Sequence, residues 1–138
     1  MPHALDILDG GRILVICFDG AVHSTDAGRL FERMLEIRRA GDVQGIVIDS
    51  SQAEVKENPA WIRGASEDFF TALGNELPVV YVGPARGWPV ERAAMLRCIA
   101  QEFDFDFEVT RDMEAGLAWL RSQIAHNAAI NPGRDAAA

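Results

Sequence analysis

The sequence predicts one α/β domain with a mostly parallel five-stranded sheet and four helices. Short apolar runs, as in buried strands, alternate with longer segments whose apolar residues recur every three or four positions. The length of 138 residues fits one domain, and the 49% of hydrophobic residues suffices for a packed core. The expected element order is β-β-α-β-α-β-α-β-α with right-handed crossovers. We expect the domain to span residues 4–126, and the proline-broken tail, residues 127–138, to be disordered.

The N-terminal part of the chain predicts a β-hairpin followed by a helix. Residues 4–8 and 12–18 have strand patterns and are joined by an Asp-Gly-Gly turn. The second run is continuously apolar, as in a strand covered on both faces. Thr25 is suited to cap a helix, and Gly41 stops it. The apolar stripe of this helix comprises Leu30, Met34 and Ile37.

The middle of the chain predicts a buried strand followed by a second helix. The strand is centred on Ile46–Ile48 and ends at Asp49-Ser50-Ser51. Asn58 is suited to cap the second helix, with Pro59 in its first turn. The apolar stripe of this helix comprises Ile62, Ala65, Phe69 and Leu73. Trp61 falls about 100° from that stripe at 3.6 residues per turn, so the core does not require it.

The C-terminal part predicts two further strands, each followed by a helix. Residues 77–83 form the fourth strand, and residues 89–103 form the third helix. Residues 105–109 alternate between apolar and acidic, which is typical of an edge strand with one wet face. The last helix starts near Met113 and is capped by Asp112. Its apolar stripe comprises Met113, Leu117, Leu120 and Ile124.

Charge and hydropathy exclude several classes of partner. The formal net charge is −8, whereas nucleic acids and anionic lipids attract proteins through clustered lysine and arginine. We therefore expect no nucleic-acid partner and no membrane partner. The chain has no apolar stretch of about 18 residues and no basic start before an apolar run, so we expect neither a membrane span nor a signal peptide. A cytoplasmic protein is the resulting prediction.

The residues that usually carry catalysis or metal binding form no recognisable motif. Cys17 and Cys98 stand within apolar patterns, as small core residues do, and lack CxxC spacing. No HExxH, phosphate loop or nucleophile elbow is present. We expect no catalytic residue, no metal site and no cofactor, hence a protein that is not an enzyme. The weakest alternative is an enzyme in which His23 and Asp49 act together as an acid–base pair.

Three segments, taken in order, carry a family resemblance: GGRILVICFDGAVHSTDAGRLFERML, VQGIVIDSS and AAMLRCIAQEFDFDFEVTRDMEAGLAWL. Together they resemble the STAS domain, the module of bacterial anti-sigma-factor antagonists and of the cytoplasmic tails of sulfate transporters. The resemblance covers roughly residues 4–124 and is nearest to STAS-like bacterial proteins known only by similarity to those antagonists. It implies a regulatory module that acts by binding, without catalytic apparatus.

The resemblance also bears on phosphorylation. In regulatory STAS proteins a serine or threonine at the start of the second helix is phosphorylated by a partner kinase. That position falls near Asn58-Pro59 here, and neither residue accepts phosphate. Ser50 and Ser51 align with the end of the preceding strand, so we expect no phosphorylation site in them. The Asp49 side chain is expected to bond loop amides.

The loops after the carboxyl ends of the strands are the predicted binding surface. Asn58, Trp61, Arg86 and Trp88 are expected to contact an unidentified protein partner there, since aromatic and arginine side chains dominate such contacts. The alternative is that both tryptophans only cover the end of the sheet. A different function also stays open, a carrier of a small apolar ligand similar to lipid-exchange domains. Trp119 lies off the apolar stripe of the last helix. It could contribute to a self-association surface, so a homodimer is a further alternative.

Overall fold

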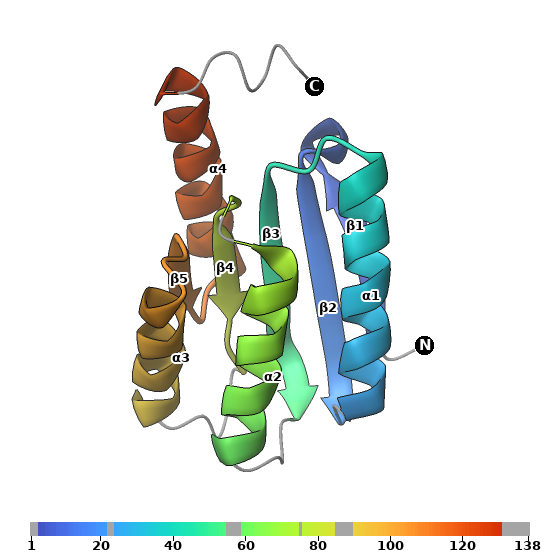
Figure 1. Ribbon diagram of the computed structural model, residues 1–138, viewed down its shortest axis with the longest axis vertical. Helices are drawn as coiled ribbons and strands as arrows, with labels where there is room; N and C mark the ends of the chain where they lie inside the picture. Colours follow the sequence, from blue (N-terminus) through green and yellow to red (C-terminus); the bar gives the residue numbers. More distant parts are fainter. Residues whose placement is uncertain (1–2, 22–23, 55–58, 75, 85–89, 131–138) are drawn as a thin grey trace.

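Five strands form one sheet in the order β1-β2-β3-β4-β5 (Figure 1). The computed structural model describes residues 3–21, 24–54, 59–74, 76–84 and 90–130. The strands are β1 (His3–Leu8), β2 (Ile13–Ala21), β3 (Gly45–Glu54), β4 (Val79–Val82) and β5 (Phe107–Thr110). β1 pairs antiparallel with β2, and the other neighbours pair in parallel. The predicted α/β class, mostly parallel sheet and element order are therefore confirmed.

Helices cover both faces of the sheet. They are α1 (Ser24–Ala40), α2 (Pro59–Leu73), α3 (Val90–Glu102) and α4 (Met113–Ile130). Buried residues of α1, α2 and α3 share one core cluster with one face of the sheet, and Leu120 of α4 belongs to the cluster on the other face. None of the described helices is long and apolar enough to span a membrane.

Phenylalanine fills the core under α1, α2 and α3. All seven phenylalanines of the chain belong to this cluster or pack against it. Neighbouring rings contact one another in a row across the sheet. Their centroids are 4.8 Å apart for Phe31–Phe69 and 4.4 Å apart for Phe70–Phe105. Burying rings of this size is the main favourable contribution to such a core. The predicted helix stripes are confirmed here by Met34, Phe69 and Leu73, each at most 4% exposed.

Two glycines allow α4 to approach the sheet closely. A Cβ atom on Gly45 of β3 would lie 2.9 Å from Leu120 Cδ1, and one on Gly116 of α4 would lie 3.2 Å from Val80 Cγ2. Leu120 consequently packs directly over the backbone of β3 and is fully buried. The helix begins as predicted, because Asp112 Oδ1 accepts a hydrogen bond from the Glu114 amide at 3.1 Å.

One arginine ties α4 to the hairpin. Arg121 Nε donates to Asp9 Oδ2 at 2.8 Å, and its Nη2 donates to Asp9 Oδ1 at 2.9 Å. Asp9 lies in a 3-10 turn, η1 (Asp9–Gly11), between β1 and β2. The bidentate bond to Arg121 lowers the pKa of Asp9. This contact links the two ends of the described chain.

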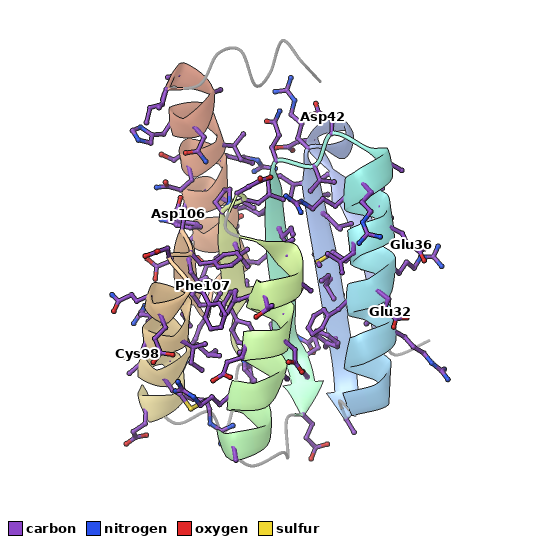
Figure 2. The ribbon with its side chains drawn as sticks, in the orientation of Figure 1. Glu32, Glu36, Asp42, Cys98, Asp106 and Phe107 are labelled. Atoms are coloured by element: carbon purple, nitrogen blue, oxygen red, sulfur yellow. The ribbon has the colours of Figure 1, made fainter. Side chains whose placement is uncertain are left out.

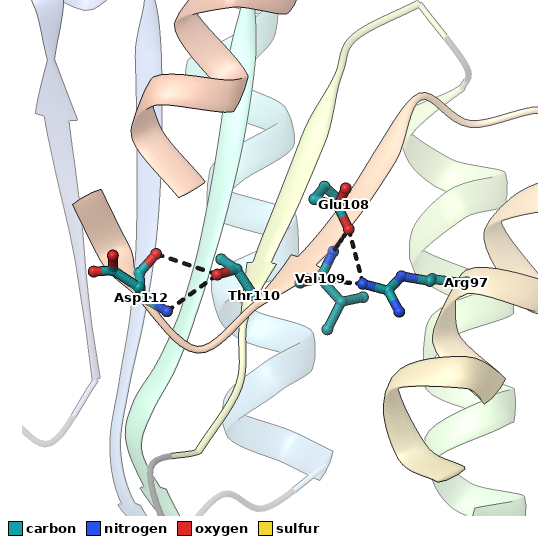
Figure 3. Close-up of polar contacts among 5 residues, drawn as sticks. All are labelled: Arg97, Glu108, Val109, Thr110 and Asp112. Atoms are coloured by element: carbon teal, nitrogen blue, oxygen red, sulfur yellow. Dashed lines mark hydrogen bonds and ion pairs between the residues drawn. The ribbon is translucent and has the colours of Figure 1, made fainter. Parts of the chain in front are cut away.

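Acidic side chains accept hydrogen bonds from backbone amides at both edges of the sheet. At β5, Glu108 Oε1 accepts the Val109 amide at 2.8 Å, and Arg97 Nη2 donates to Glu108 Oε1 and to the Val109 carbonyl at 3.0 and 3.1 Å (Figure 3). At β1, Asp6 Oδ1 accepts the Ile7 amide at 2.8 Å. Edge amides occupied in this way are poor templates for another strand.

Two sequence predictions are corrected by the fold. Cys98 lies exposed on α3 (Figure 2), so the prediction that it is a core residue is wrong. The buried side chains beside it in this helix are Leu96 and Ile99. Residues 127–130, predicted to begin the disordered tail, form the last turn of α4. Their two alanines favour helix, and the Asn-Pro step that follows in the sequence disfavours its continuation. Residues 131–138 lie outside the described part of the chain.

Candidate functional site

β2 and β3 project beyond the rest of the sheet at its carboxyl end. The last β3–β4 pair is Asp49 with Val82, whereas β2 and β3 stay paired as far as Ala21 with Glu54. Figure 1 shows the arrowheads of β2 and β3 beyond that of β4. We call this projection, residues 19–21 and 52–54, the β2–β3 ribbon. It stands on the same side of the molecule as the start of α2, because α2 follows β3 in the chain.

The Asp-Ser-Ser sequence lies where β3 contains one residue more than the facing part of β2. Cys17 is opposite Asp49 and Asp19 is opposite Gln52, so three steps along β3 match two along β2. The irregularity is held by Asp49, whose Oδ1 accepts the Ser51 amide at 3.0 Å and the Ser51 hydroxyl at 2.7 Å. Asp49 thus bonds a backbone amide as predicted, but that amide belongs to β3 and not to a loop. The prediction that the strand ends at Ser51 is wrong, because pairing with β2 carries it on to Glu54.

Ser50 points into the protein and meets Tyr81. Ser50 is 2% exposed, and its hydroxyl is hydrogen-bonded to that of Tyr81 on β4. Burial raises the pKa of Tyr81, an effect opposed by this hydrogen bond and by the positive charge of Arg92 in the first turn of α3. The Ser50 hydroxyl is therefore engaged inside the protein and is not presented to solvent.

Cys17 lies beside Asp49 on the face of the sheet that α4 covers. It is partly buried and packs against the α4-side cluster. Burial raises the pKa of its thiol, and the negative charges of Asp49 and Asp6 raise it further. The thiolate is the nucleophilic form of cysteine, so this environment suppresses its reactivity.

Alkylation should therefore distinguish the two cysteines. We expect iodoacetamide at mildly alkaline pH to modify exposed Cys98 first and Cys17 only slowly, as followed by peptide mass spectrometry. The unfolded protein should lose this difference, which provides the control. Faster modification of Cys17 in the folded protein would show that its surroundings are wrongly described.

Most of the residues predicted for partner binding lie outside the described part of the chain. These are Asn58, Arg86 and Trp88. Trp61 is in the first turn of α2, and only its backbone is described. His23 is also outside the described residues, so its pairing with Asp49 is untested. Among the described side chains, no three of His, Cys, Asp or Glu come together in a way that could hold a metal ion.

Sequence reasoning missed the contact of Ser50 with Tyr81 and the nearby Arg92. The available signal was weak: a lone tyrosine in the apolar run VVYV, and a serine directly after an apolar strand. Only the parallel register, which sets Tyr81 opposite Ile48, reveals that the two hydroxyls meet.

Comparison with known proteins identifies the architecture. No protein-family model matches the sequence, and no curated protein matches it. Among solved structures, the anti-sigma factor antagonist SpoIIAA in its unphosphorylated form matches with a TM-score of 0.54 and 11% identity, over 87% of this chain and 96% of that chain. The fold is STAS-like.

A second solved structure agrees with the STAS-like fold. It is an uncharacterized protein of the DUF3478 family with a SpoIIAA-like fold from Shewanella loihica PV-4, with a TM-score of 0.57 and 18% identity, over 86% of this chain and 91% of that chain. The resemblance drawn from the sequence segments is confirmed at the level of the fold. At these identities the chemistry of the site must be derived from the residues of this chain.

Proposed function

We propose that this STAS-like chain is a small cytoplasmic regulatory module, without catalytic chemistry, that acts through protein–protein contacts. The observation that carries the proposal is the β2–β3 ribbon, which projects from the carboxyl end of the sheet beyond β4. A projecting surface suits the broad, convex contact of a protein partner, whereas small molecules are held in concave sites.

The sheet edges support contact through loops and helix starts. Backbone amides at both edges, those of Ile7 and Val109, are already bonded to acidic side chains of this chain. A partner that added a strand would have to displace those bonds. We therefore assign recognition to the strand tips, with Asn58, Trp61, Arg86 and Trp88 as the proposed contact residues.

The serines of β3 support a module without a phosphorylation switch at this position. Ser50 is 2% exposed and bonded to Tyr81, and the Ser51 hydroxyl donates to Asp49. A kinase would have to pull both residues out of the strand to reach them. α2 begins only at Pro59, so neither serine stands at the start of that helix.

The proposal is tested by affinity capture from an extract of the source organism. The bait is the full chain, and bound proteins are quantified by mass spectrometry. We expect the double variant Trp61→Ala/Trp88→Ala to lose a partner that the wild type and a matched control, Trp119→Ala on α4, both retain. Bait purified from the host should carry no phosphate on Ser50 or Ser51.

Two other outcomes would count against the proposed function. Equal recovery of every protein by all three baits would contradict the proposed surface. A bound lipid-sized mass in native mass spectra of the freshly purified protein would favour the carrier alternative instead. Thermal unfolding of each variant establishes that a lost partner does not reflect an unfolded bait.

A further inference from the structure

A small cavity lies at the end of the sheet opposite the β2–β3 ribbon. Its volume is about 90 Å³. The walls come from the loop before β3, the loop before β4 and the last turns of α4, and include Asp42, Gln44, Glu76, Leu77, Ile124 and Asn127. Figure 2 shows Asp42 at the end of the molecule away from the arrowheads of β2 and β3. At roughly 10–15 Å³ for each water, the cavity has room for a small organic group.

The walls of this cavity are held by main-chain contacts. The amides of Gln44 and Gly45 both donate to the Arg12 carbonyl, at 2.7 and 3.1 Å. A Cβ atom on Gly45 would lie 3.0 Å from Ile124 Cδ1, so the Ile124 side chain is seated directly on β3. Leu77, 7% exposed, supplies another apolar part of the lining. The cavity thus has a fixed apolar side.

The other side of the cavity carries two acidic side chains, and Glu76 is already paired with an arginine. Glu76 Oε2 accepts from Arg38 Nη2 at 3.0 Å, and Arg38 Nη1 donates to the Leu73 carbonyl at 2.8 Å. Arg38 is thus already engaged by groups of α2 and the loop that follows it. Asp42, in contrast, makes no hydrogen bond or ion pair with any residue of the described part of the chain. Its carboxylate is available to a ligand.

The helix ends strengthen this negative charge. Because α1, α2 and α4 run opposite to the parallel strands, all three end beside the amino ends of those strands. The last carbonyls of a helix carry a partial negative charge that favours cations. The end of α2 is already contacted by Arg38 through the Leu73 carbonyl, whereas α4 has no basic residue in its last turn.

We propose that this cavity binds a small organic cation, an ammonium or guanidinium group on a short apolar stem. Asp42 pairs with the charge, and Leu77 and Ile124 contact the stem. A free amine and the side chain of a lysine or arginine from another protein share this chemistry. The site is at the far end of the sheet from the β2–β3 ribbon, so the inference does not rest on the proposed function.

The test is a titration of the ¹⁵N-labelled full chain, followed by amide chemical shifts at constant ionic strength. The probes are n-butylammonium and n-butylguanidinium chloride, with n-butanol and butyrate as neutral and anionic controls. We expect saturable shifts at Gln44, Leu77 and Asn127 with the two cations alone, with dissociation constants of about millimolar size. Asp42→Asn should weaken binding about threefold to tenfold, as expected for loss of one charged partner.

A matched variant and a fifth probe complete the experiment. Glu32→Gln removes an exposed charge on α1 outside the cavity (Figure 2) and should leave the affinity unchanged. Nα-acetyl-arginine-N-methylamide binding more tightly than n-butylguanidinium would identify a protein side chain as the source, and the reverse would identify a free amine. The absence of saturable shifts up to about 100 mM, equal binding of n-butanol, or equal binding by Asp42→Asn would overturn the proposal.

Discussion

Phe70→Ala should lower the free energy of unfolding by about 3–5 kcal/mol. Phe70 is 3% exposed and lies at the centre of the aromatic core. Its ring contacts four others, those of Phe69, Phe103, Phe105 and Phe107. Removal of the ring leaves a cavity between α2 and β5 that the surrounding rings cannot fill without leaving their own contacts. Equilibrium urea unfolding measures the loss.

Two further variants calibrate that result. Phe70→Leu keeps an apolar side chain at the site and should cost less than Phe70→Ala. Ile130→Ala changes a residue that is 60% exposed at the end of α4, so it should stay within about 0.5 kcal/mol of the wild type. A loss below about 1 kcal/mol for Phe70→Ala would mean that α2 does not pack on the sheet as described.

Leu120→Ala should have the second large effect, a loss of about 2–5 kcal/mol. Leu120 is fully buried and is the α4 side chain seated against Gly45. Its removal weakens the packing of α4 on the sheet, leaving the exposed ion pair of Arg121 with Asp9 as a link to the hairpin. Exposed ion pairs contribute little to stability, so this link cannot compensate.

Hydrogen exchange separates the local from the global part of this effect. In Leu120→Ala, amides of α4 should lose more protection than amides of β2 and β3, which keep their own pairing. Leu117→Ala, at a partly buried position of the same helix, should cost less and serves as the matched control. Unchanged protection of α4 in Leu120→Ala would contradict the packing of this helix.

The fold could be predicted from the sequence because its signals are local. Continuous apolar runs mark β2, β3 and β4, and the spacing of Phe69 and Leu73 marks the buried stripe of α2. The carboxyl ends of β2 and β3 could not be predicted. Residues 19–21 and 52–54 are polar or small, and they are strand only because they pair with each other. Hydrophobic periodicity carries no information about such a pair.

The candidate sites were predicted less completely, for a related reason. The tryptophans suggested a binding surface because aromatic side chains dominate the contacts between proteins. The contact of Ser50 with Tyr81 depends on strand register, which local patterns do not reveal. The cavity near Asp42 is formed by three segments that are distant in the sequence. Only the folded topology brings them together.

The most direct test of the central claim is the affinity of the captured protein for this chain, measured by calorimetry with purified components. If the strand tips recognise a protein, Trp61→Ala/Trp88→Ala should weaken binding by about 30-fold or more, as loss of one dominant tryptophan contact implies. Trp119→Ala should bind like the wild type. Equal affinities of the double variant and the wild type, both folded, would contradict recognition at the strand tips.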